Sequence, residues 1–122
     1  MPTYSITDLA RELALTPRTI RHYEDQGLLK PRREGTNRLF TNRDRARLKL
    51  ALKCTRLGFS LGEIKQLFDL YDIAANAGRG RDFLAKLGEW RDKLLAQRAD
   101  IDGLLAEIDF FAAAIPEESG PR

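Results

Sequence analysis

Apolar residues in the N-terminal part of the chain recur at helical spacing in short runs, separated by residues that favour helix caps and turns. Ser5 and Asp8 have the spacing of a capping box, and the apolar positions after them predict a short helix over residues 6–14. Thr16 can cap a second helix over residues 17–26. Two short helices joined by about three residues form a helix-turn-helix arrangement.

Two short strands are predicted after the second helix, over residues 28–30 and 38–40. The bend between them, residues 32–37, contains Gly35 and is longer than a two-residue hairpin loop. Its basic and polar composition is typical of a wing beside a helix that enters the DNA major groove.

Capping signals also predict two further helices. Thr41 and Asp44 start the first of them, which ends at Gly58. Ser60 starts another capping box, which opens a helix over residues 61–72. We expect the apolar faces of both helices to pack in the core. The apolar positions are Ala46, Leu48, Leu50, Ala51, Leu52, Cys54 and Leu57 in the first of these helices, and Ile64, Leu67, Phe68 and Tyr71 in the second.

A seven-residue repeat runs through the C-terminal part of the chain. The head, residues 1–72, is followed by small residues that predict a linker over 73–80 and then by one long helix over 81–115. Residues 116–122 are expected to fray. A helix of about 50 Å cannot bury its apolar stripe against so small a head, so we expect a second copy of the chain to pair with it. The predicted dimerisation positions are Leu87, Trp90, Leu94, Gln97, Ile101, Leu104, Ile108, Phe111 and Ile115, of which polar Gln97 either sets the register or is tolerated.

The composition limits the class of protein. The chain has 122 residues and is 43% hydrophobic, which allows one compact domain with an extension. No run of about 18 apolar residues is present, so no membrane-spanning helix is expected, and no signal peptide is expected from the first residues. The single cysteine, Cys54, excludes an intramolecular disulfide. These features predict a cytoplasmic protein, and the helices described above predict a mainly α-helical fold.

Charge is distributed unevenly along the chain. Residues 1–60 carry 13 Lys and Arg against 6 Asp and Glu, whereas residues 61–122 carry 8 against 12. The basic excess therefore coincides with the arginine-rich helix and bend, as expected for a polyanion-binding surface. From charge alone, a merely solvated basic surface remains the alternative.

Residues 16–31 resemble the recognition helix and first wing strand of the MerR family of bacterial transcription regulators. Residues 59–64 resemble the start of its fourth helix, and the heptad helix matches its dimer helix in position and length. The resemblance implies a winged helix-turn-helix head with two further helices, whose long terminal helices pair antiparallel in a homodimer. It also implies binding to a pseudo-palindromic promoter element with an overlong spacer, which the dimer bends and untwists for RNA polymerase.

The candidate DNA-binding residues lie on the second helix and in the bend. Arg21 and Tyr23 match the family's R-x-Y-E motif, which implies a base or backbone contact for the arginine and a phosphate contact for the tyrosine. Arg38 matches the wing arginine of the family's Y-R-x-Y motif, but Asn37 and Phe40 replace both tyrosines, so this chain lacks the two hydroxyl groups that could bind phosphate. The full set is Thr16, Arg18, Thr19, Arg21, His22, Tyr23, Arg32, Arg33 and Arg38.

Structural roles remain open for several of these side chains. The helix and wing arginines could instead form salt bridges within the protein, and Arg32 and Arg33 could simply be solvated. Tyr23 could be a core residue with its hydroxyl at the rim. His22 could pack against the protein or donate to a phosphate.

Metal or redox sensing through the family's usual site is not expected. Residues 73–122 contain no cysteine and no histidine, and soft metals and iron–sulfur clusters need such ligands. No resident cofactor is therefore expected. The chain looks most like a subgroup associated with leucine, isovalerate and fatty-acid breakdown, which implies a small organic effector such as an acyl-CoA or another catabolic intermediate. Phe68 and Tyr71 could line an effector pocket, although core packing is the simpler role.

Other function classes have less support in the sequence. An enzyme is not expected, because the chain has no nucleophile beside a base, no Gly-rich phosphate loop and no metal cluster. A coiled-coil adaptor would not need Arg18, Arg21 and Arg38. The main alternative to a sequence-specific regulator is a DNA-architectural protein with low sequence specificity.

Overall fold

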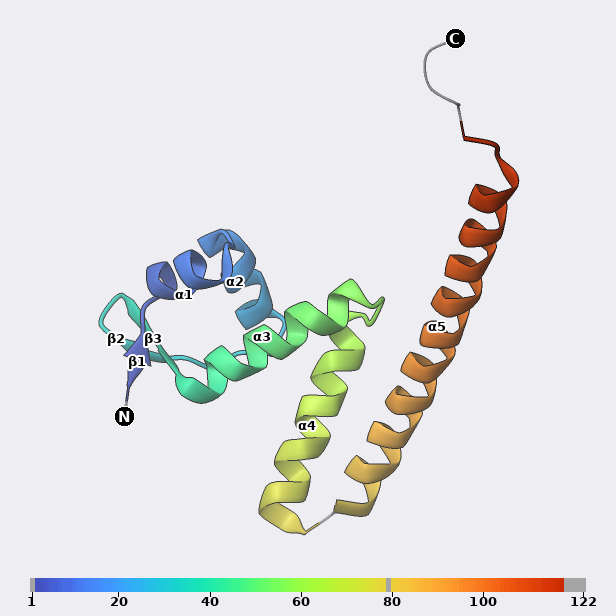
Figure 1. Cartoon of the computed structure of the whole chain (residues 1–122). Coiled ribbons are helices and arrows are strands. Elements are labelled where there is room, and N and C mark those ends of the chain that lie inside the picture. Colours follow the sequence, from blue (N-terminus) through green and yellow to red (C-terminus); the bar gives the residue numbers. More distant parts are fainter. Residues whose placement is uncertain (1, 79, 118–122) are drawn as a thin grey trace. The chain divides into compact units, whose positions relative to one another are not determined.

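The computed structural model describes residues 2–78 and 80–117 and is mainly helical (Figure 1). The described residues divide into two compact units, of which the first ends at Phe83 and the second begins at Leu84. In chain order the elements are β1 (Thr3–Tyr4), α1 (Ile6–Leu13), α2 (Pro17–Asp25), β2 (Arg32–Glu34), β3 (Asn37–Thr41), α3 (Asn42–Arg56), α4 (Leu61–Ala77) and α5 (Gly80–Ala114).

The two helices of the helix-turn-helix, α1 and α2, start at their predicted caps. The Ser5 hydroxyl accepts a 3.0 Å hydrogen bond from the amide of Asp8, whose carboxylate accepts one from the amide of Ser5. Helix α1 is followed by its C-cap residue Ala14, whose left-handed conformation (φ 55°) turns the chain towards α2. The Thr16 hydroxyl then accepts a 3.1 Å hydrogen bond from the amide of Thr19 and caps α2.

The segment that leaves α2 does not form the strand predicted over residues 28–30. Leu28 and Leu29 are buried in the core, and the amide of Lys30 donates a 3.1 Å hydrogen bond to Oδ1 of Asp44. The prediction was wrong because apolar side chains enter the core here and a side-chain acceptor, rather than a neighbouring strand, satisfies the backbone.

The hairpin formed by β2 and β3 has a tighter turn than the sequence predicted. Its two strands pair in register as far as Glu34 and Asn37. Only Gly35 and Thr36 remain in the loop, whereas the predicted bend covered residues 32–37. Gly35 has a φ of +64°, a left-handed conformation that glycine adopts without strain. The wing is therefore a compact hairpin rather than a long basic loop.

The sequence did not predict strand β1, which pairs antiparallel with β3 and gives the sheet the order β1-β3-β2. Its two residues, Thr3 and Tyr4, carry too little alternation to indicate a strand. The Tyr4 hydroxyl donates a 2.7 Å hydrogen bond to Oδ1 of Asn42 at the start of α3. Strand β1 thereby connects the beginning of the chain to the sheet and to α3.

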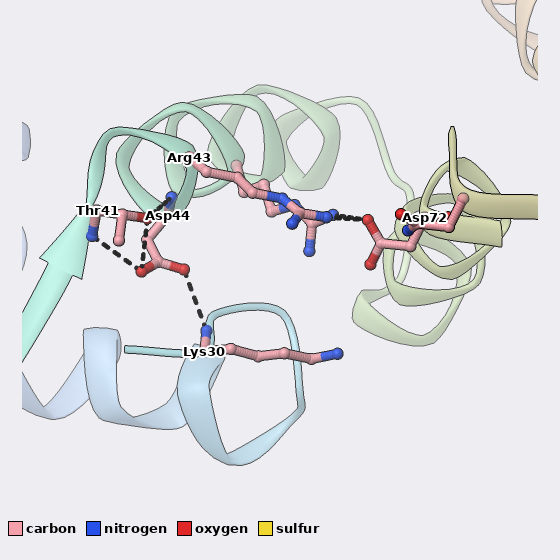
Figure 2. A network of polar contacts seen from close by, with 7 residues as sticks. Lys30, Thr41, Arg43, Asp44 and Asp72 are labelled. Carbon is pink, nitrogen blue, oxygen red and sulfur yellow. Dashed lines mark hydrogen bonds and ion pairs between the residues drawn. The ribbon is translucent and has the colours of Figure 1, made fainter. Parts of the chain in front are cut away.

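A buried carboxylate, that of Asp44, starts α3 (Figure 2). Its Oδ2 accepts hydrogen bonds from the amide of Thr41 at 3.0 Å and from the hydroxyl of Thr41 at 3.1 Å. Its Oδ1 accepts the amide of Lys30. The predicted capping box is confirmed, and the same carboxylate also holds the segment that follows α2.

Only part of the apolar face predicted for α3 lies in the core. A helix that packs on one side buries an apolar stripe about 100° wide, and the predicted positions span more of the helix than that. The structure buries Leu48 and Ala51, half-buries Leu52 and Cys54, and exposes Ala46, Leu50 and Leu57.

Helix α4 runs to Ala77, beyond its predicted end at residue 72. The predicted linker over residues 73–80 is therefore largely helical. Its small residues include several alanines, and alanine is the best helix former. Gly78, with a φ of 69°, ends the helix, so the interruption between α4 and α5 is much shorter than predicted.

Side chains of α4 join this helix to α3. The carboxylate of Asp72 accepts a hydrogen bond from Arg43 (Figure 2) and another from Arg47, the latter at 2.5 Å. The guanidinium of Arg47 also lies over the ring of Phe68, 5.0 Å from its centroid. Tyr71, which the sequence assigned to the apolar face, is instead exposed, because the buried stripe of α4 is narrower than the pattern suggested.

The core of the first unit is shared by its helices, its sheet and the segment after α2. Its fully buried side chains come from α1 to α4, from β3 and from the segment after α2. Close packing of such side chains leaves little freedom for the elements that they join. The largest of them are Leu9, Ile20, Leu28, Leu29, Phe40, Leu48 and Ile64.

Helix α5 spans 35 residues, which confirms the predicted long C-terminal helix. It ends at Ala114, so the predicted seam residue Ile115 lies just beyond it, because the residue before Pro116 is disfavoured in the helical conformation. Of the predicted frayed tail, residues 118–122 lie outside the described residues. None of the described helices is both long and apolar enough to cross a membrane.

Candidate nucleic-acid interface

Helix α2 presents a basic face to solvent. Arg18, Arg21 and His22 are exposed, whereas Ile20 and Tyr23 pack in the core. No acidic residue lies in the first turn of α2, so no negative side chain there offsets the positive end of the helix dipole. This face can therefore attract a polyanion such as a phosphate backbone.

Thr16 and Thr19, both predicted DNA contacts, interact with each other at the start of α2. Their hydroxyl oxygens are 2.9 Å apart, and the Thr16 hydroxyl also caps the amide of Thr19. Thr16 is exposed and Thr19 is half-buried. These two side chains fix where α2 begins and thus where Arg18 stands.

Tyr23 lies in the core, the alternative that the sequence left open. Its side chain belongs to the buried set, with 7% of the residue exposed. The ring of exposed His22 stands beside it, with the two ring centroids 6.4 Å apart. Tyr23 therefore packs on the buried side of α2, and His22 is the member of this pair that faces solvent.

Glu24 joins α2 to the hairpin. Its Oε1 accepts a 2.6 Å hydrogen bond from Nε of Arg38, and its Oε2 accepts one at 3.3 Å from Nη2 of Arg33. The side chains of Glu24 and Arg38 are only 16% and 22% exposed, against 56% for Arg33. The sequence left salt bridges of the wing arginines open as an alternative but did not identify Glu24 as their partner, although the glutamate of the R-x-Y-E motif was an available signal.

Arg32 differs from the other wing arginines. In the ladder Arg33 stands opposite Arg38, whereas Arg32 stands opposite Leu39. Because successive side chains of a strand point to opposite faces, Arg32 lies on the face of the hairpin away from Glu24. The three wing arginines that the sequence grouped together therefore divide between two faces, and Arg32 is exposed.

Helix α3 carries basic residues that were not predicted from the sequence as part of the interface. Lys49, Lys53 and Arg56 recur at spacings of four and three residues and are all exposed. Residues at these spacings share one face of a helix, which was the available signal. The first unit thus carries exposed basic residues on α3 as well as on α2 and the wing.

An exposed ion pair connects α1 to α3. Nε of Arg45 lies 2.9 Å from both carboxylate oxygens of Glu12, and the guanidinium stands 5.7 Å from the centroid of the Tyr4 ring. The hydrogen bond from Arg45 lowers the pKa of Glu12, and the same bond raises the pKa of Arg45. This surface contact joins the end of α1 to α3.

Metal ligands do not gather anywhere in residues 2–78 and 80–117, where no group of three His, Cys, Asp or Glu side chains could hold an ion. Cys54 is half-buried, and burial raises the pKa of its thiol. Burial therefore disfavours the thiolate, which is the form of cysteine that binds metals.

The predicted seam residues of α5 differ in exposure. Trp90 is buried, and Leu94 and Gln97 are half-buried. The seam residues from Ile101 onward are exposed, as is Leu87. So many large apolar side chains on one helix mark an interaction surface rather than an ordinary solvated face. The exposed members are Leu87, Ile101, Leu104, Ile108, Phe111 and Ile115.

Two family models match the chain. Residues 4–70 match the model described as MerR HTH family regulatory protein, and residues 45–110 match the one described as MerR, DNA binding. Among curated proteins, the HTH-type transcriptional regulator ZntR of Escherichia coli is 42% identical over 69 residues, 55% of this chain and 49% of that protein. The regulator CueR of Vibrio cholerae is 38% identical over 68 residues, 54% and 49% of the two chains. The chain spans about half the length of the curated relatives it matches.

Solved structures with the same fold include MerR family regulators, one of them bound to promoter DNA. HiNmlR, a MerR family regulator lacking the sensor domain and bound to promoter DNA, aligns with a TM-score of 0.78 and 25% identity, covering 92% of this chain and 89% of that one. A MerR family regulator from Bacillus thuringiensis aligns with a TM-score of 0.76 and 25% identity, covering 93% and 100%.

Proposed function

The chain belongs to the MerR family of helix-turn-helix regulatory proteins, and from this premise we propose that it is a sequence-specific transcription regulator that binds promoter DNA as a homodimer. The observation that carries the proposal is the exposed basic face of α2 next to an arginine-bearing hairpin. The promoter DNA bound to HiNmlR, a protein of the same fold, supports the choice of ligand.

Helix α2 is the element that we propose enters the major groove. Arg18 and Arg21 project from its exposed side and can reach base edges or phosphates. The hairpin would lie against the neighbouring backbone, where Gly35 lets the turn approach closely. Phosphate contacts of this kind fix the register, while contacts to base edges give the specificity.

The homodimer is supported by the apolar surface of α5. A coiled-coil partner would cover the a and d positions that are exposed from Ile101 to Phe111. A second copy of the chain offers the same seven-residue repeat and therefore a self-complementary surface, as two-fold dimers require.

Charge favours an antiparallel arrangement of the two helices. Residues 80–98 carry five Lys and Arg and three Asp and Glu, whereas residues 99–117 carry five Asp and Glu and no basic residue. Antiparallel pairing places the acidic half of one helix beside the more basic half of the other, and parallel pairing would place the acidic halves together. The proposed dimer is therefore antiparallel.

Regulation would act through the shape of the promoter. We propose that the dimer binds a pseudo-palindromic element and bends and untwists its spacer, so that RNA polymerase recognises the altered DNA. A small organic effector, such as an acyl-CoA or another intermediate of leucine, isovalerate or fatty-acid breakdown, would set the balance between the two promoter states. The site of action would be the cytoplasm.

Sequence specificity separates this proposal from an architectural role. Fluorescence anisotropy at one fixed salt concentration would compare the promoter DNA upstream of the protein's own gene with a scrambled duplex. A regulator should prefer its operator by about a thousandfold or more. Equal affinity for both duplexes, and for a genome-derived library, would favour the architectural alternative.

A further inference from the structure

Glu24 receives hydrogen bonds from two different strands of the wing. It lies in the last turn of α2, and its two carboxylate oxygens separately accept Arg38 of β3 and Arg33 of β2. With only 16% of its side chain exposed, the carboxylate is held between the helix and the hairpin. One side chain of the recognition helix thus contacts both strands of the wing through charged hydrogen bonds.

The carboxylate of Glu24 also neutralises a repulsion between two positive charges within the hairpin. Arg33 and Arg38 stand directly opposite each other in the antiparallel ladder, and like charges at such positions destabilise a strand pair. Strand β2 has three residues, so the hairpin gains little stability from its own ladder. Glu24 offsets the repulsion and at the same time fixes the hairpin against α2.

We infer that Glu24 is a positioning residue for DNA binding, which sets the angle between the wing and the recognition helix without touching the duplex. The inference rests on the proposed DNA-binding function. The recognition helix must reach the major groove while the wing reaches the adjacent DNA backbone. Because the angle between them is already fixed in the free protein, DNA binding does not have to order the wing, and no conformational entropy is lost at that step. Glu24 supplies that fixed angle through Arg33 and Arg38.

An inhibitory role of Glu24 would predict a change in DNA affinity of the opposite sign. If Glu24 only withheld the two arginines from DNA phosphates, removing its charge would increase affinity. Simple electrostatics also predicts an increase, because the variant has one negative charge fewer close to DNA. A positioning role predicts a decrease in spite of that gain, which makes the direction of the change decisive.

The test compares Glu24→Gln with Asp25→Asn. Asp25 is the next residue of α2 and is exposed, so its substitution removes the same charge without altering the wing contact. Anisotropy against the promoter duplex and a scrambled duplex, at several salt concentrations, should show Glu24→Gln binding the promoter about tenfold or more weakly than wild type. Asp25→Asn should bind as well as wild type or better.

The salt dependence separates positioning from general destabilisation. If the wing no longer reaches the DNA backbone, the slope of log affinity against log salt should fall by about one for each phosphate that the protein ceases to neutralise. A partly unfolded variant would instead bind both duplexes more weakly with an unchanged slope, and thermal unfolding would reveal it. A Glu24→Gln affinity equal to or above that of Asp25→Asn overturns the inference.

Hydrogen exchange tests the wing directly and needs no DNA. Amides of residues 32–41 should exchange faster in Glu24→Gln than in Asp25→Asn, because the hairpin loses its anchor. Equal exchange would overturn the inference even if DNA binding falls. If wild type shows no preference for any promoter DNA, the proposed function fails, while the exchange comparison still decides whether Glu24 positions the wing.

Discussion

The amide of Lys30 donates a 3.1 Å hydrogen bond to Oδ1 of Asp44, a buried carboxylate 14 residues further along the chain. The other oxygen of the same carboxylate caps α3 through Thr41. One side chain thus connects the segment that leaves α2 with the start of α3 (Figure 2).

Asp44→Asn should lower the free energy of unfolding by about 1–3 kcal/mol, because an amide cannot accept at both positions while its NH₂ group faces donors. Urea unfolding followed by circular dichroism measures the change. Asp8→Asn, in the exposed capping box of α1, is the matched control and should lower the free energy of unfolding less than Asp44→Asn does, because water can replace the lost hydrogen bonds there. Equal costs for the two variants would contradict a special role for Asp44.

Gly27→Ala should destabilise the head for two separable reasons. Gly27 has a φ of +82°, and a Cβ built there would lie 2.7 Å from Cε of Lys65. The backbone conformation alone costs an alanine about 1–2 kcal/mol. Gly35→Ala, at φ +64° in open space, provides the backbone cost without the clash.

Adding Lys65→Ala should recover the steric part of the Gly27→Ala cost. The closest atoms to the new methyl belong to the flexible end of the lysine side chain, so a double-variant cycle of unfolding free energies isolates the contact. Strictly additive effects would show that the lysine moves aside freely.

Arg21→Ala should weaken binding to the promoter duplex by about 1–3 kcal/mol if the guanidinium reads a base. Its side chain is on the exposed face of α2. Anisotropy at fixed salt measures the decrease, and Arg98→Ala, which removes the same charge from α5, is the control. An affinity within error of the control would remove Arg21 from the interface.

Leu94→Asp should break the proposed dimer, because it places a charge in the apolar seam of α5. Leu95→Asp is the matched control, since the neighbouring leucine lies outside the a and d positions. Light scattering at micromolar concentration should report a monomer for the first variant and a dimer for the second. A Leu94→Asp dimer would disprove the heptad assignment.

Helix starts were predictable because capping is local. The capping boxes at Ser5, Thr41 and Ser60 form as the sequence indicated, since each depends on residues three positions apart. The strand predicted over residues 28–30 was wrong for the converse reason. The amide of Lys30 bonds to Asp44, a side chain 14 residues away in the sequence. Local patterns cannot reveal such a partner.

Exposure was harder to predict than secondary structure. Leu50, Leu57 and Tyr71 fit an apolar pattern but lie on the surface, because the pattern does not say how wide a buried stripe will be. Within the candidate site, the exposure of Arg18 and Arg21 followed from helical spacing. The contacts of Glu24 depend on the hairpin register, which places Arg33 opposite Arg38. That register could not be predicted, because the turn of the hairpin is tighter than the sequence indicated.

The carboxylate that Arg33 and Arg38 share constrains the order in which these positions can change during evolution. A lineage that first loses Glu24 leaves two facing arginines without a counter-charge, so that step should be selected against. A lineage that first replaces one arginine by a neutral residue keeps a working ion pair. Divergent descendants should therefore lose an arginine before they lose the glutamate, and the three positions should drift together rather than independently.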